Sequence, residues 1–474
     1  MFKYLLYQIE YRKWLFFALL VAIAIHLLPG TPELTRDAKA TLAIVVMTVL
    51  LVILEPVPLP VVALLIVVLE VIFQIATPSR VAQSFMSDSV MFIGGSMMLA
   101  VAVAKQHLDK RILLFILRLT RTNMPWTVFS VVGISALLAS VMGEHSVAAI
   151  MLPVAVMLVR LSQSKEPGLE DLKVLFMMSV AHGCAVAAIA TPSAGARNAI
   201  MLDYWKGSAG LNVGYLDWMC FMYPLAVVQV PILYFALLHT YRPELGNLTR
   251  AYASLRREMV QQQKLRTEDW ITIWIVIITL LLWMFSSKTL GLGPVALIGV
   301  LLCVLTGVLT WADINRDLNW GVIMLYASII SIGLWMDTTG AADWIAINMQ
   351  LLLGFLHIHG GVPLIMVTAL VGMVVGSLLS TGPGIAILGP IVLKQAQLSG
   401  SSPLILGMVV VASASYANLT PASSPACSII YGSGMVRAQD YVRIGLKMSV
   451  FSFVTIVLFA AFYWPIVSRF LHFE

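Results

Sequence analysis

The sequence predicts an all-α polytopic membrane protein, and three observations lead to that fold class. First, 60% of the 474 residues are apolar and only 11% are charged, whereas a soluble domain carries about 25% charged residues. Second, the mean hydropathy is +0.93, and apolar runs long enough to cross a bilayer, about 20 residues, recur along the chain. Third, two long apolar runs carry polar residues at their middle. These features exclude a soluble enzyme, a nucleic-acid-binding domain and a secreted disulfide scaffold.

Continuous apolar runs predict about 11 transmembrane helices. The first run, Trp14–Leu28, is not followed by a small-residue cleavage site, and further apolar spans come after it. We therefore interpret it as a transmembrane helix rather than a signal peptide. In chain order, the expected spans are 14–30, 39–55, 58–76, 89–106, 172–200, 215–240, 268–286, 292–311, 318–339, 403–432 and 441–467.

Two further apolar stretches, 125–160 and 361–397, predict re-entrant hairpins. Each is long, and each has Gly, Ser and polar residues in its middle rather than at its end. A helix that breaks at membrane depth must give its freed backbone groups other partners, such as protein, water or a ligand. Two half-helices that meet at a tip would satisfy this requirement.

The distribution of Lys and Arg predicts the topology. The chain carries 29 Lys and Arg against 23 Asp and Glu, a net charge of +6. The loops at 107–124, 241–267 and 434–447 hold much of the positive charge and fall on one face if both hairpins return to the side they entered. The positive-inside rule then places this multi-pass protein in the cell membrane with a cytoplasmic N-terminus and an external C-terminus. The basic stretch 248–266 is expected to lie on the membrane lipid as an interfacial helix.

Similar motifs recur in the two halves of the chain and predict an internal repeat. The stretch IMLPVAV (150–156) matches ILGPIVL (387–393), and Thr191-Pro192 matches Thr420-Pro421. An odd number of expected spans separates the two copies, so the repeats are expected to be inverted. Inverted repeats with broken helices that face each other in the membrane are typical of alternating-access transporters.

Candidate functional residues lie at the breaks of the two hairpins. Glu144 and His145 occupy the first break, and an ionisable residue at membrane depth points to function, although a hydrogen bond that closes the tip is the alternative. The second break holds Ser380, Thr381 and Gly382, which are small enough to expose backbone N–H and C=O groups.

The two Thr-Pro stretches, 191–198 and 420–428, are the other candidates, because proline and small residues open the helix backbone to a ligand. Arg197 lies in the first of them. Its guanidinium could snorkel to the membrane interface, or it could hold an anion. In the second case we expect Arg197 and a protonated His145 to receive the anion.

Three further ionisable residues fall within the expected spans. Glu70 has no obvious partner, and an interhelical hydrogen bond or a role in proton movement would both account for it. His182 is expected to be a packing residue, and Asp337 to lie near the end of a span. No Walker motif, zinc motif or GxSxG occurs, so we expect a protein that is not an enzyme and has no cofactor.

Several motifs together resemble the divalent anion:sodium symporter family (solute carrier 13) over roughly residues 40–470. They are FIGGSMMLAVAVAKQHLDKRILLFILR (92–118), GAADWIA (340–346) and TPASSPACSIIYGSG (420–434). The resemblance implies a homodimer with scaffold and elevator-like transport domains. It also implies that the substrates are dicarboxylates, citrate or sulfate, usually carried with sodium.

The sequence departs from this family at the substrate and sodium motifs. The family's Ser-Asn-Thr motifs correspond to Gly143-Glu144-His145 and Ser380-Thr381-Gly382, so both asparagines are replaced. Its Pro-Pro-Asn motifs correspond to Ala196-Arg197-Asn198 and Pro425-Ala426-Cys427. Because Glu144 replaces a neutral ligand and can take up a proton, we expect transport driven by protons or by substrate exchange rather than strictly by sodium.

We therefore predict a secondary active transporter of small anions. The expected substrate-binding residues are Glu144, His145, Ser146, Thr191, Gly195, Arg197, Asn198, Ser380, Thr381, Gly382, Ser424 and Pro425. The expected ion-coupling residues, for a proton or sodium, are Gly143, Glu144, His145, Ala194, Thr381 and Ser423. The expected segments are scaffold helices (1–88), a first repeat (89–205), a span with the interfacial helix (206–267), further scaffold (268–317), a second repeat (318–434) and a C-terminal span (435–474).

Three alternatives remain open from the sequence. The first is a cation/proton antiporter or metalloid exporter of the same superfamily, in which Glu144 would bind the cation. The second is a transporter of a lipid-linked group, and the third is a membrane-embedded enzyme. The partners expected for the preferred function are a small anion, membrane lipid and a second copy of the chain, with no nucleic acid.

Overall fold

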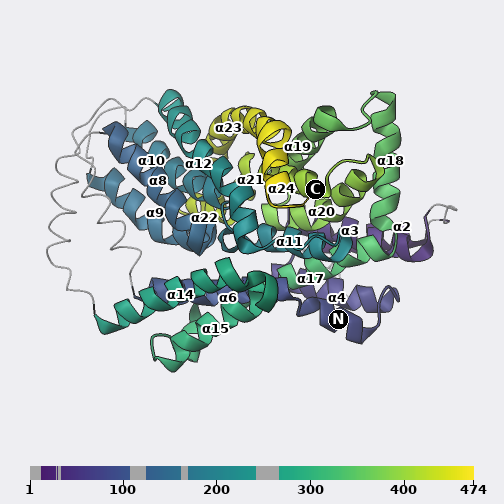
Figure 1. The fold of residues 1–474 in the computed structure, drawn as a ribbon, viewed down its shortest axis with the longest axis horizontal. Helices are drawn as coiled ribbons and strands as arrows, with labels where there is room; N and C mark the ends of the chain where they lie inside the picture. Colours follow the sequence, from purple (N-terminus) through teal and green to yellow (C-terminus); the bar gives the residue numbers. More distant parts are fainter. Residues whose placement is uncertain are drawn as a thin grey trace.

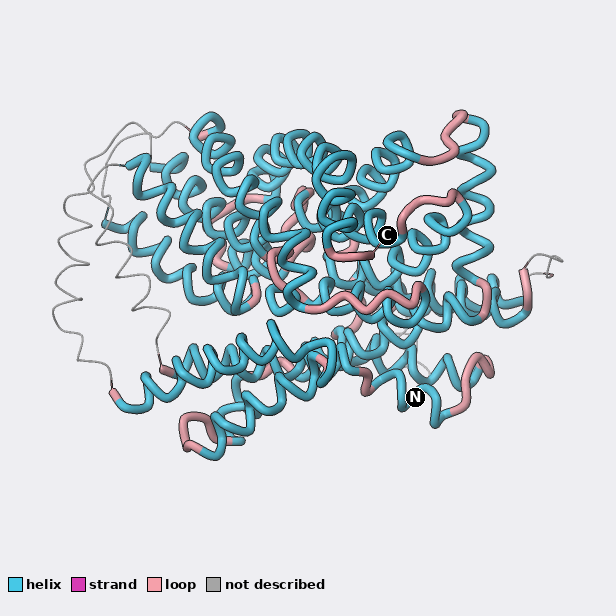
Figure 2. Tube along the Cα trace, in the orientation of Figure 1, coloured by secondary structure: helices cyan, strands magenta, loops and turns pink. Residues whose placement is uncertain are grey.

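The computed structural model describes residues 12–27, 29, 34–106, 124–161, 169–241 and 266–473. Over these ranges the chain is helical, with short loops and no strand (Figure 2). Eight of the described helices are long and apolar enough to cross a membrane, and six more are apolar helices of 10–17 residues. The predicted all-α membrane fold is therefore confirmed. The expected interfacial helix 248–266 and the basic loop at 107–124 lie almost wholly outside the described residues.

In the described part of the first half, the chain begins with five helices and continues through a helical hairpin. The helices before the hairpin are α2 (Lys13–Leu27), α3 (Arg36–Leu54), α4 (Leu59–Ile72), α5 (Pro78–Phe85) and α6 (Asp88–Lys105). The hairpin and the elements after it are α8 (Met124–Met142), α9 (Glu144–Leu161), α10 (Leu169–Ala187), the short η1 (Pro192–Ala194), α11 (Ala196–Ser208) and α12 (Tyr215–Thr240).

The second half repeats this element order. Its first helices are α14 (Thr267–Leu290), α15 (Leu292–Leu305), α16 (Trp311–Asp317), α17 (Trp320–Thr338) and α18 (Ala341–Phe355). The hairpin and the elements after it are α19 (Gly361–Leu378), α20 (Thr381–Leu398), α21 (Pro403–Tyr416), α22 (Pro425–Gly432), α23 (Ala438–Leu458), the π-turn η2 (Phe459–Tyr463) and α24 (Trp464–Phe470). Helix α18 does not correspond to any of the spans expected from the sequence.

The two halves also pack against each other reciprocally. Helix α6 packs on α15 and α16, while its counterpart α17 packs on α4 and α5. In the same way α11 packs on α20 and α21, while α22 packs on α9 and α10. Such exchange of equivalent contacts is what a two-fold relationship between two copies produces. The predicted repeat is therefore present in the fold as well as in the motifs.

Close approach of small residues explains one of these contacts. A Cβ atom built on Gly95 of α6 would lie 2.6 Å from the Cβ of Ala296 in α15. Without the glycine, the two backbones could not approach this closely, which is how small residues favour helix packing in membranes. Figure 1 shows α6, α14 and α15 together in one layer, beneath the layer that contains α8, α9 and α10.

Both predicted hairpins form, and each breaks at a residue with positive φ. Gly143, with φ of +83°, separates α8 from α9, and Ser380, with φ of +24°, precedes α20. Glycine reaches this conformation without steric cost, whereas serine does so rarely. In each hairpin the next helix starts directly after this residue.

Equivalent threonines fasten each hairpin to the broken span that follows it. The Thr191 hydroxyl donates to the carbonyl oxygen of Ser140, at 2.5 Å. The Thr420 hydroxyl donates to the carbonyl oxygen of Ser377, at 2.7 Å. Both acceptors lie in the last turn of the first hairpin arm, where the break leaves carbonyl groups without helical partners. The two Thr-Pro motifs therefore satisfy the backbone at the two tips.

The three other ionisable residues now have defined surroundings. Glu70 accepts a hydrogen bond from the Ser331 hydroxyl in α17, at 2.9 Å, so it joins α4 to α17. The buried His182 ring stacks on Tyr441, with the ring centroids 6.1 Å apart, as expected for a packing residue. Asp337 lies one residue before the end of α17, close to the end of a span as predicted.

Candidate functional site

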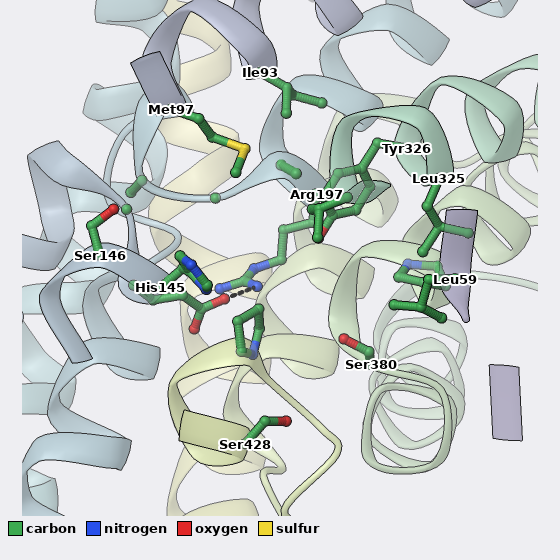
Figure 3. A pocket seen from close by; sticks show the side chains of 18 of the residues that line it. Leu59, Ile93, Met97, His145, Ser146, Arg197, Leu325, Tyr326, Ser380 and Ser428 are labelled. Carbon is green, nitrogen blue, oxygen red and sulfur yellow. Dashed lines mark hydrogen bonds and ion pairs between the residues drawn. The ribbon is translucent and has the colours of Figure 1, made fainter. Parts of the chain in front are cut away.

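A buried ion pair joins the first hairpin to the broken span that follows it. Glu144 is the first residue of α9 and Arg197 is the second residue of α11. The Arg197 Nη1 atom lies 2.7 Å from Glu144 Oε1, and the two side chains are only 2% and 5% exposed (Figure 3). The negative carboxylate is favourably placed at the N-terminus of its helix. Arg197 therefore does not snorkel to an interface.

The same guanidinium also reaches the second hairpin. Arg197 Nη1 donates to the hydroxyl of Thr381, the first residue of α20, at 2.5 Å. The backbone N–H of Thr381 in turn donates to the Ser423 carbonyl oxygen, at 3.0 Å. One side chain thus connects the tips of both hairpins across the repeat boundary.

Several polar atoms of this group have no protein partner among the described residues. They are Glu144 Oε2 and the Nε and Nη2 atoms of Arg197. Leaving a buried polar atom unpaired costs about 1–3 kcal/mol, and more when the group is charged. The Nε and Nη2 atoms form one edge of the guanidinium, the edge that holds a carboxylate through two parallel hydrogen bonds. The site therefore has an unused pair of donors suited to an anion.

Gly195 makes room for this arrangement. A Cβ atom there would lie 3.3 Å from Arg197 Cζ and 3.0 Å from the carbonyl oxygen of Ala188. The first contact is tight and the second involves backbone that cannot move freely, so a larger residue would displace the guanidinium. Gly195 is therefore needed for packing beside the guanidinium.

The ion pair borders a cavity of about 520 Å³. This volume lies within the range of small-molecule sites, which is about 300–1,000 Å³. One side of the cavity is formed by residues at the starts of α9, α11, α20 and α22. Helix N-termini carry partial positive charge and are common binding places for anions. This side of the cavity, with Arg197 on it, is electrostatically suited to a negative group.

The opposite side of the cavity is largely apolar. It comes from α3, α4, α6 and α17, and its apolar residues include Leu59, Ile93, Met97 and Leu325 (Figure 3). The polar residues on this side are Glu55, Ser96 and Tyr326. The cavity therefore lies between a polar surface made by the hairpins and broken spans and a mostly apolar wall made by other helices.

The structure brings most of the predicted site residues to this cavity. Those that line it are Gly143, Glu144, His145, Ser146, Ala194, Gly195, Arg197, Ser380 and Pro425. Those that lie behind the lining are Thr191, Asn198, Thr381, Gly382, Ser423 and Ser424. Among these, Asn198 donates to the carbonyl oxygens of Ala188 and Thr191, and the Ser424 hydroxyl accepts from the backbone N–H of Cys427.

Sequence reasoning did not single out the residues of the apolar wall. Tyr326 lines the cavity and packs against Gly382, where any side chain would overlap its ring. Glu55 also lines the cavity, from the C-terminal end of α3, with φ of +44°. Neither lies beside a break or a repeated motif. An apolar residue that faces a cavity has the same pattern in the sequence as one that faces lipid.

Two repeated halves, each with a hairpin and a broken span that meet at a shared cavity, define a membrane transporter. The chain belongs to the family described as Sodium:sulfate symporter transmembrane region, whose model matches residues 11–470. The resemblance read from the motifs is therefore confirmed, and the protein is a multi-pass membrane protein of a transporter family.

Its relatives are similar over nearly their whole length. An uncharacterized transporter of Haemophilus influenzae is 25% identical, covering 95% of each chain. The citrate/succinate antiporter of Escherichia coli K12 is 24% identical, covering 96% of this chain and 98% of the relative. The sodium-dependent dicarboxylate transporter SdcS of Staphylococcus saprophyticus is 19% identical, covering 87% and 83%.

The fold also resembles a solved transporter structure. The Alcanivorax borkumensis YdaH transporter, described as having an unusual topology, matches with a TM-score of 0.55 at 13% identity. The match covers 81% of this chain and 86% of that one. At this identity the likeness concerns the fold alone.

Proposed function

We propose that this protein is a secondary active transporter that binds a small anion, such as a dicarboxylate, citrate or sulfate, on Arg197. The observation that carries the proposal is the buried guanidinium of Arg197, a residue that lines the cavity and whose Nε and Nη2 donors have no protein partner among the described residues. The relatives named for citrate, succinate and dicarboxylate transport support an organic anion.

In this proposal Glu144 and the substrate alternate as the counter-charge of Arg197. Without substrate, the Glu144 carboxylate forms an ion pair with the guanidinium at 2.7 Å. When the anion binds Arg197, the guanidinium no longer fully balances the negative charge of Glu144. An unbalanced charge in such a buried place costs several kcal/mol. Glu144 then takes up a proton and becomes neutral. Binding of the anion is thereby coupled to binding of a proton.

Two processes would reset the site at the other face of the membrane. Release of both anion and proton would restore the ion pair, which gives proton-driven symport. Replacement of one anion by another, with Glu144 still protonated, gives exchange. Neither requires sodium. The cytoplasmic N-terminus, external C-terminus and homodimer expected from the sequence complete the proposal, and labelling of single cysteines introduced at each terminus in intact cells would test the orientation.

The test is uptake of labelled succinate, citrate and sulfate into proteoliposomes with an imposed pH gradient and no sodium. We expect the gradient to drive uptake, and Arg197→Ala to abolish saturable uptake. Glu144→Gln should remove the dependence on the gradient while exchange stays partly active. Asp343→Asn is the matched control, because it removes a carboxylate of α18 that does not line the cavity. Uptake that needs sodium and ignores the pH gradient would contradict proton coupling.

The ion pair also bears on the alternative of a cation/proton antiporter. A cation at Glu144 would lie within a few ångströms of the Arg197 guanidinium, which is 2.7 Å from the carboxylate. Like charges this close oppose each other strongly at low dielectric constant. The geometry therefore favours an anion as the transported ion.

A further inference from the structure

We infer that the site accepts a single negative charge, so that a dicarboxylate is carried with its second carboxyl group uncharged. The inference rests on the proposed function and specifies the charged form of its substrate. The class of substrate is then a monocarboxylate, or the half-protonated form of a dicarboxylate.

The charged residues of the cavity are the first support. Among the described residues, Arg197 is the only Lys or Arg that lines the cavity, whereas Glu144 and Glu55 are both acidic. His145 also lines it and is the one other side chain there that can become positive at physiological pH. With Glu144 protonated, Arg197 balances one carboxylate. A second carboxylate would meet no further Lys or Arg among the described lining residues, and the exposed Glu55 adds negative charge there.

The available hydrogen-bond donors are the second support. Arg197 Nη1 already donates to Glu144 and to Thr381. The remaining pair, Nε and Nη2, matches the two oxygens of one carboxylate. Beyond the guanidinium the cavity meets the wall of α3, α4, α6 and α17, whose side chains are largely apolar. An ionised group at that wall would lose its hydration without gaining a charged partner.

Several donors at the helix N-termini around the cavity are not available for a second negative charge. Glu144 itself occupies the start of α9. The start of α22 is capped, since the Ser424 hydroxyl accepts from the backbone N–H of Cys427 at 3.2 Å. At the start of α20, the Thr381 N–H is bonded to the Ser423 carbonyl oxygen. These N-termini favour negative charge in general, but some of their donors are already engaged within the protein.

The experiment compares succinate with its half-amide succinamate and its diamide succinamide, which have nearly the same shape and differ in charge. Purified protein in nanodiscs is titrated with each compound, and binding is followed by calorimetry. At about pH 8, where ordinary carboxyl groups are ionised, we expect the half-amide to bind at least about tenfold more tightly than succinate, because the second carboxylate stays unpaired. The diamide should not bind.

The ratio of the two affinities isolates the charge of the ligand. Protonation of Glu144 affects both ligands alike, so it cancels in the ratio. We expect the advantage of the half-amide to shrink about tenfold for each unit by which the pH falls, as the competent half-protonated succinate becomes more abundant. Glu55→Gln should raise the affinity for succinate more than that for the half-amide. His145→Gln should leave the ratio unchanged.

The possible results separate this inference from the proposed function. If succinate binds more tightly than the half-amide at about pH 8, the single-charge inference is wrong, while loss of all binding in Arg197→Ala would still support an anion site. If a change at His145 abolishes tight succinate binding, a second cation exists and the inference is again wrong. If no carboxylate binds and Arg197→Ala changes nothing, the proposed function itself fails.

Discussion

Removing one partner of the Glu144–Arg197 ion pair should destabilise the protein more than removing both partners. Arg197→Leu leaves the Glu144 carboxylate, only 5% exposed, without its counter-charge. Removing one partner of a buried ion pair typically costs about 3–5 kcal/mol, whereas replacing both by apolar residues is often neutral. Because Glu144 borders a cavity that water can enter, we expect the lower end, about 3 kcal/mol, for Arg197→Leu and a similar value for Glu144→Leu.

The double variant Glu144→Leu with Arg197→Leu is the informative comparison. We expect it to lose about 1 kcal/mol or less, so that the two single changes are strongly non-additive, with a coupling of about 5 kcal/mol. Glu144→Gln should cost less than Glu144→Leu, because the amide oxygen can still accept from the guanidinium. The free energy of unfolding is measured in mixed micelles by titration with SDS.

The outcome of this cycle does not depend on knowing the substrate. If the single changes cost less than about 1 kcal/mol each and add in the double variant, the two charges are hydrated separately and the ion pair is not a feature of the folded protein. The proposal that Glu144 and a substrate compete for one guanidinium would then lose its basis.

Three further predictions concern other parts of the structure. Gly195→Ala should cost about 1–3 kcal/mol and abolish transport by displacing the neighbouring guanidinium, whereas Gly354→Ala, whose Cβ would meet nothing within 4 Å, should do neither. The Lys105 hydrogen bond, at 2.6 Å, holds the pKa of Asp313 below its usual range. Asp313→Asn should therefore lower the melting temperature at neutral pH. The difference should begin to shrink below about pH 4, where that carboxyl takes up a proton in the unfolded chain, and should vanish only when the pH falls through the lower pKa of the folded protein. Glu70→Met should leave transport intact and raise stability by about 1 kcal/mol in thermal unfolding, because it replaces a buried carboxyl group that holds one hydrogen bond.

The parts of the fold with a local signal could be predicted from the sequence. Both hairpin breaks follow from polar residues inside apolar runs, and they occur at Gly143 and Ser380. The Thr-Pro motifs predicted the two broken spans for the same reason. Helix α18 was missed, because its 15 residues are short for a span and carry no break or motif of a hairpin.

The pairing inside the site could not be predicted, because it joins residues far apart in the sequence. Glu144 and Arg197 are 53 positions apart, and Arg197 and Thr381 are 184 apart. From the sequence, Arg197 was expected to act with His145 on an anion, whereas the guanidinium contacts the carboxylate next to that histidine. Glu70 likewise lacked a visible partner, since Ser331 lies 261 positions away. Composition and spacing identify polar residues at membrane depth, but not which of them meet.

The ion pair also bears on how the proposed transport cycle responds to voltage. Carrying one elementary charge across a membrane potential of 100 mV takes about 2.3 kcal/mol. Arg197 and Glu144, held 2.7 Å apart, are together neutral, and a guanidinium that holds a monoanion beside a protonated carboxyl group is neutral as well. The electric field would then do no work on the site in either the empty or the loaded state. A voltage imposed with potassium and valinomycin should leave the transport rate unchanged, so that chemical gradients alone set the direction of transport.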